Sequence, residues 1–226
     1  PNGGVFTGGG TNTYIIGTND LTLIDPGPID ESHTKNILDA YGDRIKRILV
    51  THTHMDHSPL AMPLSKKLNV PVMGMTILDN MQYQDESFVP TLHLKDGDLI
   101  ETDEYTIEAV HTPGHASNHL CYLIKEVNCL ITGDHIMQGS TVVIAPPDGD
   151  MRDYLLSLKK LKNYKIDFLA PGHGEFIERP FETVDWIVNH RLKREAKVIN
   201  KLQEKGKISL EDLVLSVYDD VDPRLH

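Results

Sequence analysis

The stretch Thr51–Ser58 constrains this chain more than any other, because it reads Thr-His-Thr-His-Met-Asp-His-Ser. Residues 52–57 alone carry three imidazoles and one carboxylate. Neutral imidazole is the commonest protein ligand for zinc, and carboxylate oxygen binds the same ion readily. Although 12 histidines in 226 residues would bring some together by chance, this density predicts a site for one metal ion or for two.

The histidine-rich stretch directly follows an apolar run at 45–50, which is typical of a buried strand. Alternate side chains of an extended chain share a face. His52, His54 and Asp56 therefore converge only as far as the chain stays extended, and His57 starts on the opposite side. The pattern predicts a strand that ends in a sharp turn at the metal site.

The rest of the chain alternates between short apolar runs and amphipathic stretches. Ser58 followed by Pro59 is typical of a helix start and predicts a helix over 59–68, which Pro63 kinks or restarts. Glycines at 8–10 precede no Gly-Lys-Ser/Thr, which argues against a phosphate-binding loop. The segment 76–95 predicts a loop over the site or a short helix. Strands are predicted at 11–16, 21–25, 45–51, 70–75, 97–110, 120–124, 128–131 and 166–170, and further helices at 30–41, 151–162, 180–205 and 209–218.

Histidine or aspartate also follows other predicted strands. Each of these residues alone fits a turn, but four strand ends that bear His or Asp predict ligands converging at one edge of a sheet. Asp25 is either part of an Asp-Pro-Gly turn or the partner that holds a metal ligand in place. The others are His111, His115 and His119 around a Pro-Gly turn, Asp134 and His135 after 128–131, and His173 after 166–170.

Length and composition predict one substantial globular domain with a small extension, since 39% of the 226 residues are hydrophobic. No apolar run approaches the roughly 18–20 residues that span a bilayer, so we expect no membrane partner. Cys121 and Cys129 lack a close CxxC spacing and predict free core thiols in a reducing compartment. We expect a cytoplasmic protein, or one of an organellar matrix if a leader preceded Pro1.

Charge is unevenly distributed along the chain. The formal net charge of −11 argues against a generally nucleic-acid-binding surface. Residues 190–207 nevertheless carry seven Lys and Arg against two Glu, a local net charge of +5. This segment predicts contact with an anionic partner, with Arg191 and Arg194 as candidate anion-binding residues.

Taken in order, the motif His52-x-His54-x-Asp56-His57, His115, Asp134 and His173 resembles the metallo-beta-lactamase-fold superfamily over about residues 11–174. Gly10-Thr11-Asn12-Thr13-Tyr14, Asp25-Pro26-Gly27 and His190-Arg191 are most similar to the beta-lactamase-like protein 2 group, which is related to glyoxalase II. The resemblance implies an α/β fold, a four-layer αβ/βα sandwich with metals at one sheet edge. It also implies a catalytic domain at 1–180 and, at 181–226, a helical segment that begins a winged-helix-like module.

The resemblance further implies a binuclear centre of two divalent ions, zinc first, with manganese or iron as alternatives. Its chemistry is a hydrolysis in which a metal-bridging hydroxide attacks the substrate and Asp56 orients that hydroxide. His119 and His135 are candidates for the acid that protonates the leaving group. Asp25 corresponds to a residue that supports the ligands. The implied ligands are His52, His54 and His115 for the first metal, Asp56, His57 and His173 for the second, and Asp134 for both.

Several substrates remain open from the sequence. Beta-lactam hydrolysis is the poorer interpretation, because beta-lactamases of this fold typically lack an aspartate at the position of Asp134. A phosphodiester, such as single-stranded RNA, and a thioester carried by a small molecule are the two preferred substrates. The alternative class is a metal-binding interaction module without catalytic turnover. Electron transfer by a pair of irons is disfavoured, because it requires a flavin domain that this chain lacks.

Overall fold

The computed structural model describes residues 2–4, 7–76 and 84–219 of the chain. The chain divides into two compact units, Pro1–Phe181 and Glu182–His226, and each is described by itself. Within the described residues, no helix is long and apolar enough to cross a membrane.

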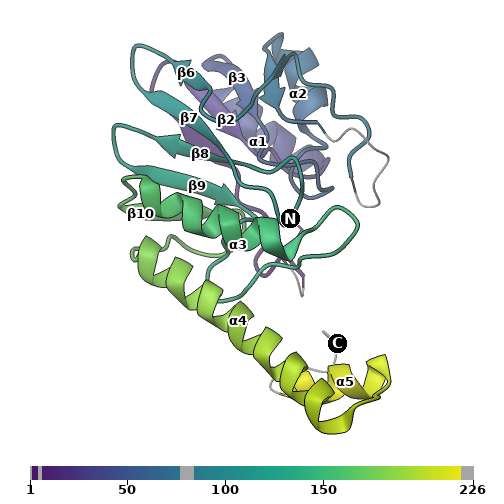
Figure 1. The fold of residues 1–226 in the computed structure, drawn as a ribbon. Coiled ribbons are helices and arrows are strands. Elements are labelled where there is room, and N and C mark those ends of the chain that lie inside the picture. Colours follow the sequence, from purple (N-terminus) through teal and green to yellow (C-terminus); the bar gives the residue numbers. More distant parts are fainter. Residues whose placement is uncertain (1, 5–6, 77–83, 220–226) are drawn as a thin grey trace. The chain divides into compact units, whose positions relative to one another are not determined.

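The first sheet of the larger unit has the strand order β1-β2-β3-β4-β5 (Figure 1). β1 and β2 form the predicted antiparallel hairpin, whereas β2 to β5 run parallel to one another. The carboxyl ends of the parallel strands therefore meet at one edge, where ligands of open α/β sheets usually gather. The strands are β1 Tyr14–Ile16, β2 Leu21–Ile24, β3 Ile45–Leu49, β4 Val72–Gly74 and β5 Leu92–His93.

The second sheet has the order β10-β9-β8-β7-β6. Only the pair of β10 with β9 is parallel among its described pairings, and the other pairs are antiparallel. The predicted strand at 97–110 is in fact two strands, because the chain turns between them at Thr102–Tyr105. The strands are β6 Leu99–Glu101, β7 Thr106–His111, β8 Leu120–Ile124, β9 Cys129–Gly133 and β10 Phe168–Pro171.

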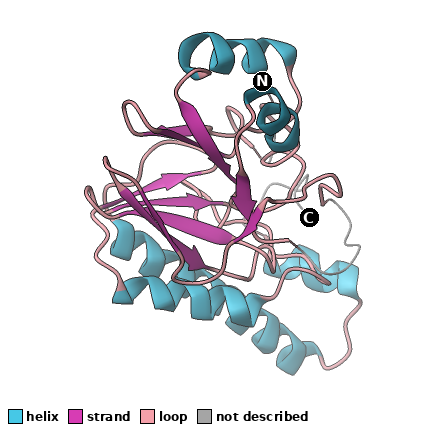
Figure 2. Ribbon diagram, turned by 90° about the horizontal axis from the view of Figure 1, so that it is seen from above, coloured by secondary structure: helices cyan, strands magenta, loops and turns pink. Residues whose placement is uncertain are grey.

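The two sheets pack face to face, with α1 (Glu31–Tyr41) and α2 (Ala61–Leu68) outside the first and α3 (Met151–Lys160) outside the second (Figures 1 and 2). Neighbouring residues of a strand serve different layers, because successive side chains point to opposite faces. Ile48 packs toward the outer helices, whereas Leu49 joins the core between the sheets. The fully buried Tyr122 also joins the sheets, since its hydroxyl donates to the carbonyl of Val50 at 2.7 Å. The predicted four-layer α/β sandwich is confirmed.

The helix predicted over 59–68 begins later than expected. α2 starts at Ala61, and the Ser58 hydroxyl donates to the Asp85 carboxylate at 2.7 Å instead of capping the helix. Pro63 consequently lies in the first turn, where its missing N–H costs no helical hydrogen bond and produces no kink. The segment 76–95 falls partly outside the described residues, at 77–83; its described part includes β5 and an isolated bridge between Gln84 and His54.

The smaller unit contains most of α4 (Pro180–Lys205) and α5 (Leu210–Val217). Ser209 caps α5, because its hydroxyl accepts the backbone N–H of Asp212 at 3.1 Å. The Arg194 guanidinium donates to the Val217 carbonyl and lies 4.5 Å from the centre of the Tyr218 ring. Arg194 thus fastens α5 to α4, and the anion-binding role of Arg191 and Arg194 stays a prediction.

Candidate metal centre

Seven sequence-predicted residues lie together at the carboxyl edge of the sheets, in two clusters. The first, the three-histidine cluster, consists of His52, His54 and His115. The second, the carboxylate–histidine cluster, consists of Asp56, His57, Asp134 and His173. Within each cluster one potential ligand atom per residue lies within 4.8 Å of all the others.

The three-histidine cluster brings three ring nitrogens to one point. Nε2 of His52 and Nε2 of His115 both lie 2.9 Å from Nδ1 of His54. One imidazole nitrogen cannot share protons with two others at once, so the arrangement is poor as a hydrogen-bond network. Three nitrogens around a common point are the donor set that a tetrahedral metal ion accepts.

The carboxylate–histidine cluster places two imidazoles among two carboxylates. Nε2 of His173 lies 3.3 Å from the Asp56 carboxylate and 3.2 Å from that of Asp134. Nε2 of His57 lies 3.5 Å from Asp56 and 3.3 Å from Asp134. Mixed nitrogen and oxygen donors of this kind suit divalent zinc, manganese or iron.

Asp134 lies between the two clusters. Its Oδ1 is the atom that approaches His57 and His173, while its Oδ2 lies 3.7 Å from Nε2 of His115. The carboxylate thus faces one cluster with each oxygen, which is the arrangement that a ligand shared by two ions requires.

Asp25 holds the first turn of the site from beneath. Its carboxylate accepts the Thr51 backbone N–H at 2.7 Å, the Thr51 hydroxyl at 2.6 Å and the His57 Nδ1–H at 2.8 Å. Thr51 Oγ1 in turn lies 3.0 Å from Nδ1 of His52. One buried carboxylate therefore supports a histidine in each cluster, and its backbone holds a left-handed φ of 49° to do so.

The outer ring nitrogens of two other histidines also meet oxygen atoms. Nδ1 of His115 lies 2.6 Å from the carbonyl of Val143, and Nδ1 of His173 lies 3.2 Å from the carbonyl of Gly10. A carbonyl accepts only, so each Nδ1 carries a proton, which leaves Nε2 as the ring nitrogen that can bind a metal once it is deprotonated. Both histidines are thus held in the tautomer that binds a metal.

The two clusters differ in their proton affinities. Burial, reinforced by His115, lowers the pKa of His54 to about 4, so this imidazole is neutral at physiological pH. Burial on its own raises the pKa of Asp56, but the contacts with His173 and His57 outweigh it and lower that pKa to about 2. Burial on its own lowers the pKa of His173. The carboxylates of Asp134 and Asp56 outweigh burial and raise that pKa to about 10.

The remaining histidines of the predicted strand ends lie outside the two clusters. His119 accepts the Asp134 backbone N–H on Nε2 at 3.1 Å, and its Nδ1 contacts Thr112. It therefore positions Asp134 and is fully buried, which disfavours it as a leaving-group acid. His135 is also fully buried, and burial lowers its pKa to about 3, so the ring is neutral rather than an imidazolium at neutral pH, which disfavours it as an acid.

Three contacts of the site escaped the sequence analysis as functional features. The Thr11 hydroxyl donates to Oδ2 of Asp56 at 3.1 Å, and Thr51 links Asp25 to His52. A Cβ at Gly172 would lie 2.7 Å from Oδ1 of Asp134, so only glycine fits there without displacement. The threonine in Gly-Thr-Asn-Thr and the glycine in Pro-Gly-His were the available signals.

The chemistry of the donor set tests whether a metal fits. His57 Nε2 and Asp134 Oδ1 are buried and make no hydrogen bond of acceptable geometry within the part of the chain that the structure describes. Such orphaned atoms cost free energy unless a partner satisfies them. They point to the same place as the other ligand atoms of their cluster, which is compatible with a bound divalent cation.

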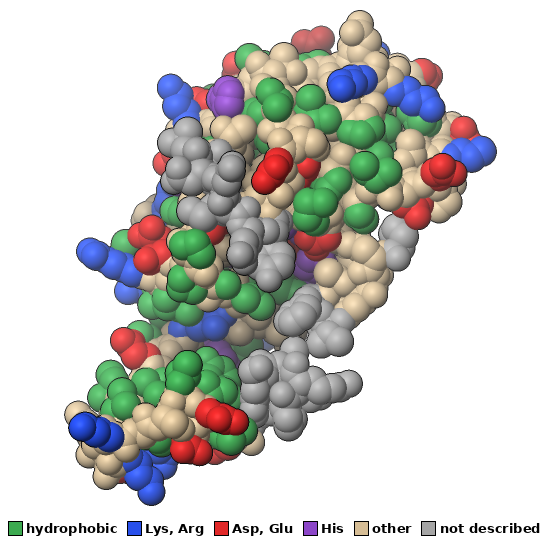
Figure 3. All heavy atoms as spheres, turned by 90° about the vertical axis from the view of Figure 1, so that its right-hand side faces the viewer, with side chains coloured by type: hydrophobic (Ala, Val, Ile, Leu, Met, Phe, Trp, Pro, Cys, Tyr) green, Lys and Arg blue, Asp and Glu red, His purple; other side chains and the backbone are tan. Residues whose placement is uncertain are grey.

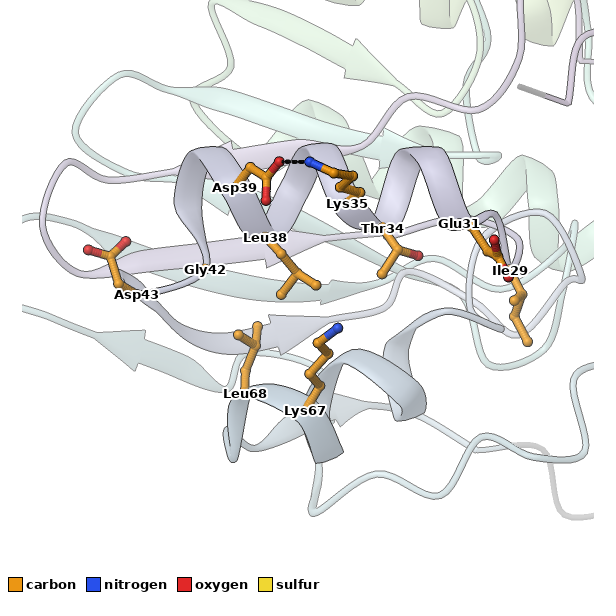
Figure 4. Close-up of a pocket in the computed structure, with 10 residues that line it drawn as sticks. All are labelled: Ile29, Glu31, Thr34, Lys35, Leu38, Asp39, Gly42, Asp43, Lys67 and Leu68. Carbon is orange, nitrogen blue, oxygen red and sulfur yellow. Dashed lines mark hydrogen bonds and ion pairs between the residues drawn. The ribbon is translucent and has the colours of Figure 1, made fainter.

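A separate pocket lies elsewhere on this unit. It has a volume of about 640 Å³ and opens between α1 and α2, where Leu38, Lys67 and Leu68 line it (Figure 4). Its lysine Lys35 pairs with Asp39 on the same helix, and its lining includes no residue of either cluster. We assign the functional site to the clusters, because imidazole and carboxylate ligand atoms converge there.

Comparison with known proteins identifies the family. The sequence profile described as the metallo-beta-lactamase superfamily matches residues 6–173, a range that includes all seven cluster residues. The chain belongs to the metallo-beta-lactamase superfamily. The resemblance predicted from the ligand order is confirmed.

Among the relatives, a beta-lactamase-like protein 2 homolog of Caenorhabditis elegans is 32% identical over 228 residues, which cover 97% of this chain and 74% of that protein. An atrochrysone carboxyl ACP thioesterase of Aspergillus chevalieri is 30% identical over 233 residues, covering 97% of this chain and 71% of that protein. These relatives support hydrolase chemistry in general terms.

A solved structure supports the fold of this superfamily member. A metallo-beta-lactamase family protein from Thermus thermophilus matches with a TM-score of 0.77 at 19% identity. The match covers 92% of this chain and 82% of that one. At this identity the likeness establishes the architecture, and the substrate has to be argued from the site itself.

Proposed function

We propose that this superfamily member is a binuclear metal-dependent hydrolase that cleaves an ester-type bond. The observation that carries the proposal is Asp134, whose two carboxylate oxygens face the two clusters separately. His52, His54 and His115 would hold one ion, Asp56, His57 and His173 the other, and Asp134 both. Zinc is the first choice of metal, with manganese or iron as alternatives.

Two divalent ions held there would supply a bridging water whose pKa is lowered enough to yield the attacking hydroxide, and a Lewis acid for the substrate oxygen. The protein's own part is to place the donors. Thr11 donates to Oδ2 of Asp56, the oxygen that faces His57 and His173, and so holds this carboxylate toward its own cluster. Asp25 fixes His57 directly and His52 through Thr51, which keeps both rings oriented for their ions.

The proposed bond is a thioester or a phosphodiester. The thioester is favoured by the fungal relative, which is named an ACP thioesterase. The phosphodiester of a single-stranded RNA is favoured by the basic composition of residues 190–207. Both reactions need an activated water and a polarised oxygen, and neither needs a serine or cysteine nucleophile.

One assay tests the proposal. The purified protein is loaded with zinc or manganese and given S-lactoylglutathione or a single-stranded RNA oligonucleotide, with metal content measured in parallel. We expect about two equivalents of metal and turnover of one substrate. Replacement His54→Ala should lower that turnover about 100-fold or more, whereas His93→Ala, which changes an exposed histidine on β5, should not.

Two results would overturn the hydrolase assignment. Less than about one equivalent of metal after reloading would remove the binuclear centre. Full loading without turnover of either substrate would favour a metal-binding interaction module instead.

A further inference from the structure

The residues around the clusters bear on the substrate class, and this inference rests on the hydrolase function proposed above. The segments that reach the carboxyl edge are the ones that follow or connect the strands there. As printed in the sequence, none of them contains a lysine or arginine. In the described part of the chain they are residues 8–13, 25–30, 50–60, 75–76, 84–91, 112–119, 134–150 and 172–176.

The same segments do carry acidic residues beyond the clusters. Glu86, Asp150 and Glu175 are exposed, and Asp148 is half-buried. Basic residues of this unit such as Arg44 and Lys125 lie instead in turns at the opposite ends of the strands. Around the proposed ions, a polyanion that approaches these segments meets like charge and no lysine or arginine on them, which disfavours the extended phosphate contacts of a nucleic acid.

Two apolar side chains stand exposed beside the three-histidine cluster. Met55 lies between two cluster residues in sequence and is 54% exposed, and Val143 is 53% exposed. The carbonyl of Val143 is the one that meets His115 Nδ1 at 2.6 Å. Figure 3 shows histidine and acidic side chains together in a hollow near the middle of this face, with apolar side chains beside it.

The loop that bears Val143 is fastened to the metal motif. The Thr53 hydroxyl donates to Gln84 Oε1 at 2.5 Å, and Gln84 Nε2 donates to Asp148 at 3.1 Å. Asp148 also accepts the backbone N–H of Ser117 at 3.1 Å. These bonds hold the Val143 loop to the turn that contains Met55, so an apolar contact at this place is preorganised.

We propose that the substrate is a thioester with an apolar acyl chain, whose chain contacts Met55 and Val143 while its carbonyl lies over the clusters. Water is the second reactant. A C–O bond forms between its oxygen and the carbonyl carbon, and the C–S bond breaks. The remaining proton of the water goes to the thiolate or to the solvent. The products are a carboxylic acid and a thiol. Single-stranded RNA is the excluded alternative.

The test compares acyl chains on one neutral carrier. Metal-loaded protein hydrolyses the acetyl and octanoyl thioesters of N-acetylcysteamine, and a single-stranded RNA oligonucleotide is assayed beside them. We expect kcat/KM for octanoyl to exceed that for acetyl by about tenfold or more, because each methylene that leaves water for an apolar contact favours binding. RNA cleavage should stay below either.

Substitution then locates the acyl contact. Met55→Ser and Val143→Ser should each lower the octanoyl-to-acetyl ratio of kcat/KM by about fivefold, because each removes apolar contact area. Val127→Ser is the matched control, since Val127 is 52% exposed in the β8–β9 turn, at the other end of that hairpin from the clusters. It should leave the ratio unchanged.

The outcomes separate this inference from the proposed function. Hydrolysis of thioesters with no chain-length preference, or with a ratio that both substitutions leave unchanged, would overturn the acyl contact and leave the hydrolase intact. Faster cleavage of RNA than of the octanoyl thioester would overturn it equally. Fully loaded protein that turns over none of these substrates would instead count against the hydrolase itself.

Discussion

The three-histidine cluster and the carboxylate–histidine cluster lie at the same edge of the sandwich, but their electrostatic environments are opposite. In the first, burial keeps an imidazole neutral, with the pKa of His54 at about 4. In the second, carboxylates and imidazoles stabilise one another's charges. Burial opposes the charge on His173, but Asp134 and Asp56 outweigh it and raise the pKa of His173 to about 10. The first cluster is ready for a cation at neutral pH, whereas the second has to release protons to bind one.

The largest expected effect comes from Asp134, the one residue that belongs to both sides of this comparison. Asp134→Ala should remove the shared carboxylate and lower kcat/KM by about 1000-fold or more, since metal activation of water supplies several kcal/mol. Metal content should fall below one equivalent. Asp103→Ala, in the exposed β6–β7 turn, is the control and should keep both ions. Retention of two equivalents in Asp134→Ala would show that the clusters are independent.

Each single histidine replacement should remove the metal ion of one cluster and leave that of the other. His54→Ala should lose one equivalent from the three-histidine cluster and leave the other ion bound, with activity reduced about 100-fold or more. His57→Ala should lose the other ion, and it also leaves Asp25 without one of its partners. Metal analysis and thermal unfolding would distinguish them, because only His57→Ala should lower the metal-free melting temperature appreciably. Equal melting temperatures would contradict the assigned contacts.

Asp25→Asn should weaken both clusters at once. The amide presents one acceptor and one donor where Thr51 and His57 together supply three donors, so a buried donor is left without its acceptor. We expect the free energy of unfolding to fall by about 2–4 kcal/mol and metal affinity to fall about 10–100-fold. Asp43→Asn, at an exposed turn, is the control. A loss of affinity confined to one ion would contradict the shared support.

Gly172→Ala should disturb the carboxylate–histidine cluster more than the other. Its Cβ would lie 2.7 Å from Asp134 Oδ1 and 2.8 Å from Cε1 of His57, and overpacking of this kind costs about 1–3 kcal/mol. Urea unfolding measures that loss. Gly9→Ala is the matched control, because a Cβ there meets nothing within 4 Å. An unchanged midpoint for Gly172→Ala would mean that the backbone relaxes freely.

Proton release gives the smallest effect. Burial lowers the pKa of His57 and of His173, but the facing carboxylates outweigh it and raise both. Both rings therefore carry a second proton on the metal-free protein at pH 7. Metal binding should therefore release protons, and metal affinity should decrease as the pH falls. Calorimetric titration in buffers of different ionisation enthalpy measures the number of protons released on metal binding. His57→Ala should release fewer protons, whereas an equal release would assign them to other groups.

The sequence predicted the parts of the site that depend on residue type and order. The turn at 51–58 is identifiable by its density of ligands, and the distant His115, Asp134 and His173 are visible because each follows an apolar run. Resemblance to a family was needed to divide them between two ions, since spacing alone cannot say which strand ends approach one another.

The supporting contacts were beyond reach for a physical reason. Val143 and Gly10 contribute backbone carbonyls, which leave no trace in residue type, and Gly172 contributes the absence of a side chain. The start of α2 was predicted too early, because Ser58 satisfies the buried carboxylate of Asp85 across 27 residues of sequence. Helix-capping rules consider only neighbouring residues, so they cannot predict that a distant carboxylate takes the Ser58 hydroxyl.

The seven ligands are divided between the two sheets: the first supplies the turn after β3, and the second supplies the residues after β7, β9 and β10. Ions held between them would act as a cross-link between the halves of the sandwich. The free energy of metal binding would then add to the free energy of unfolding, by an amount that grows with free metal concentration. Metal scarcity would shorten the lifetime of the folded protein as well as silence its chemistry, and unfolded copies would be cleared first from cells low in metal.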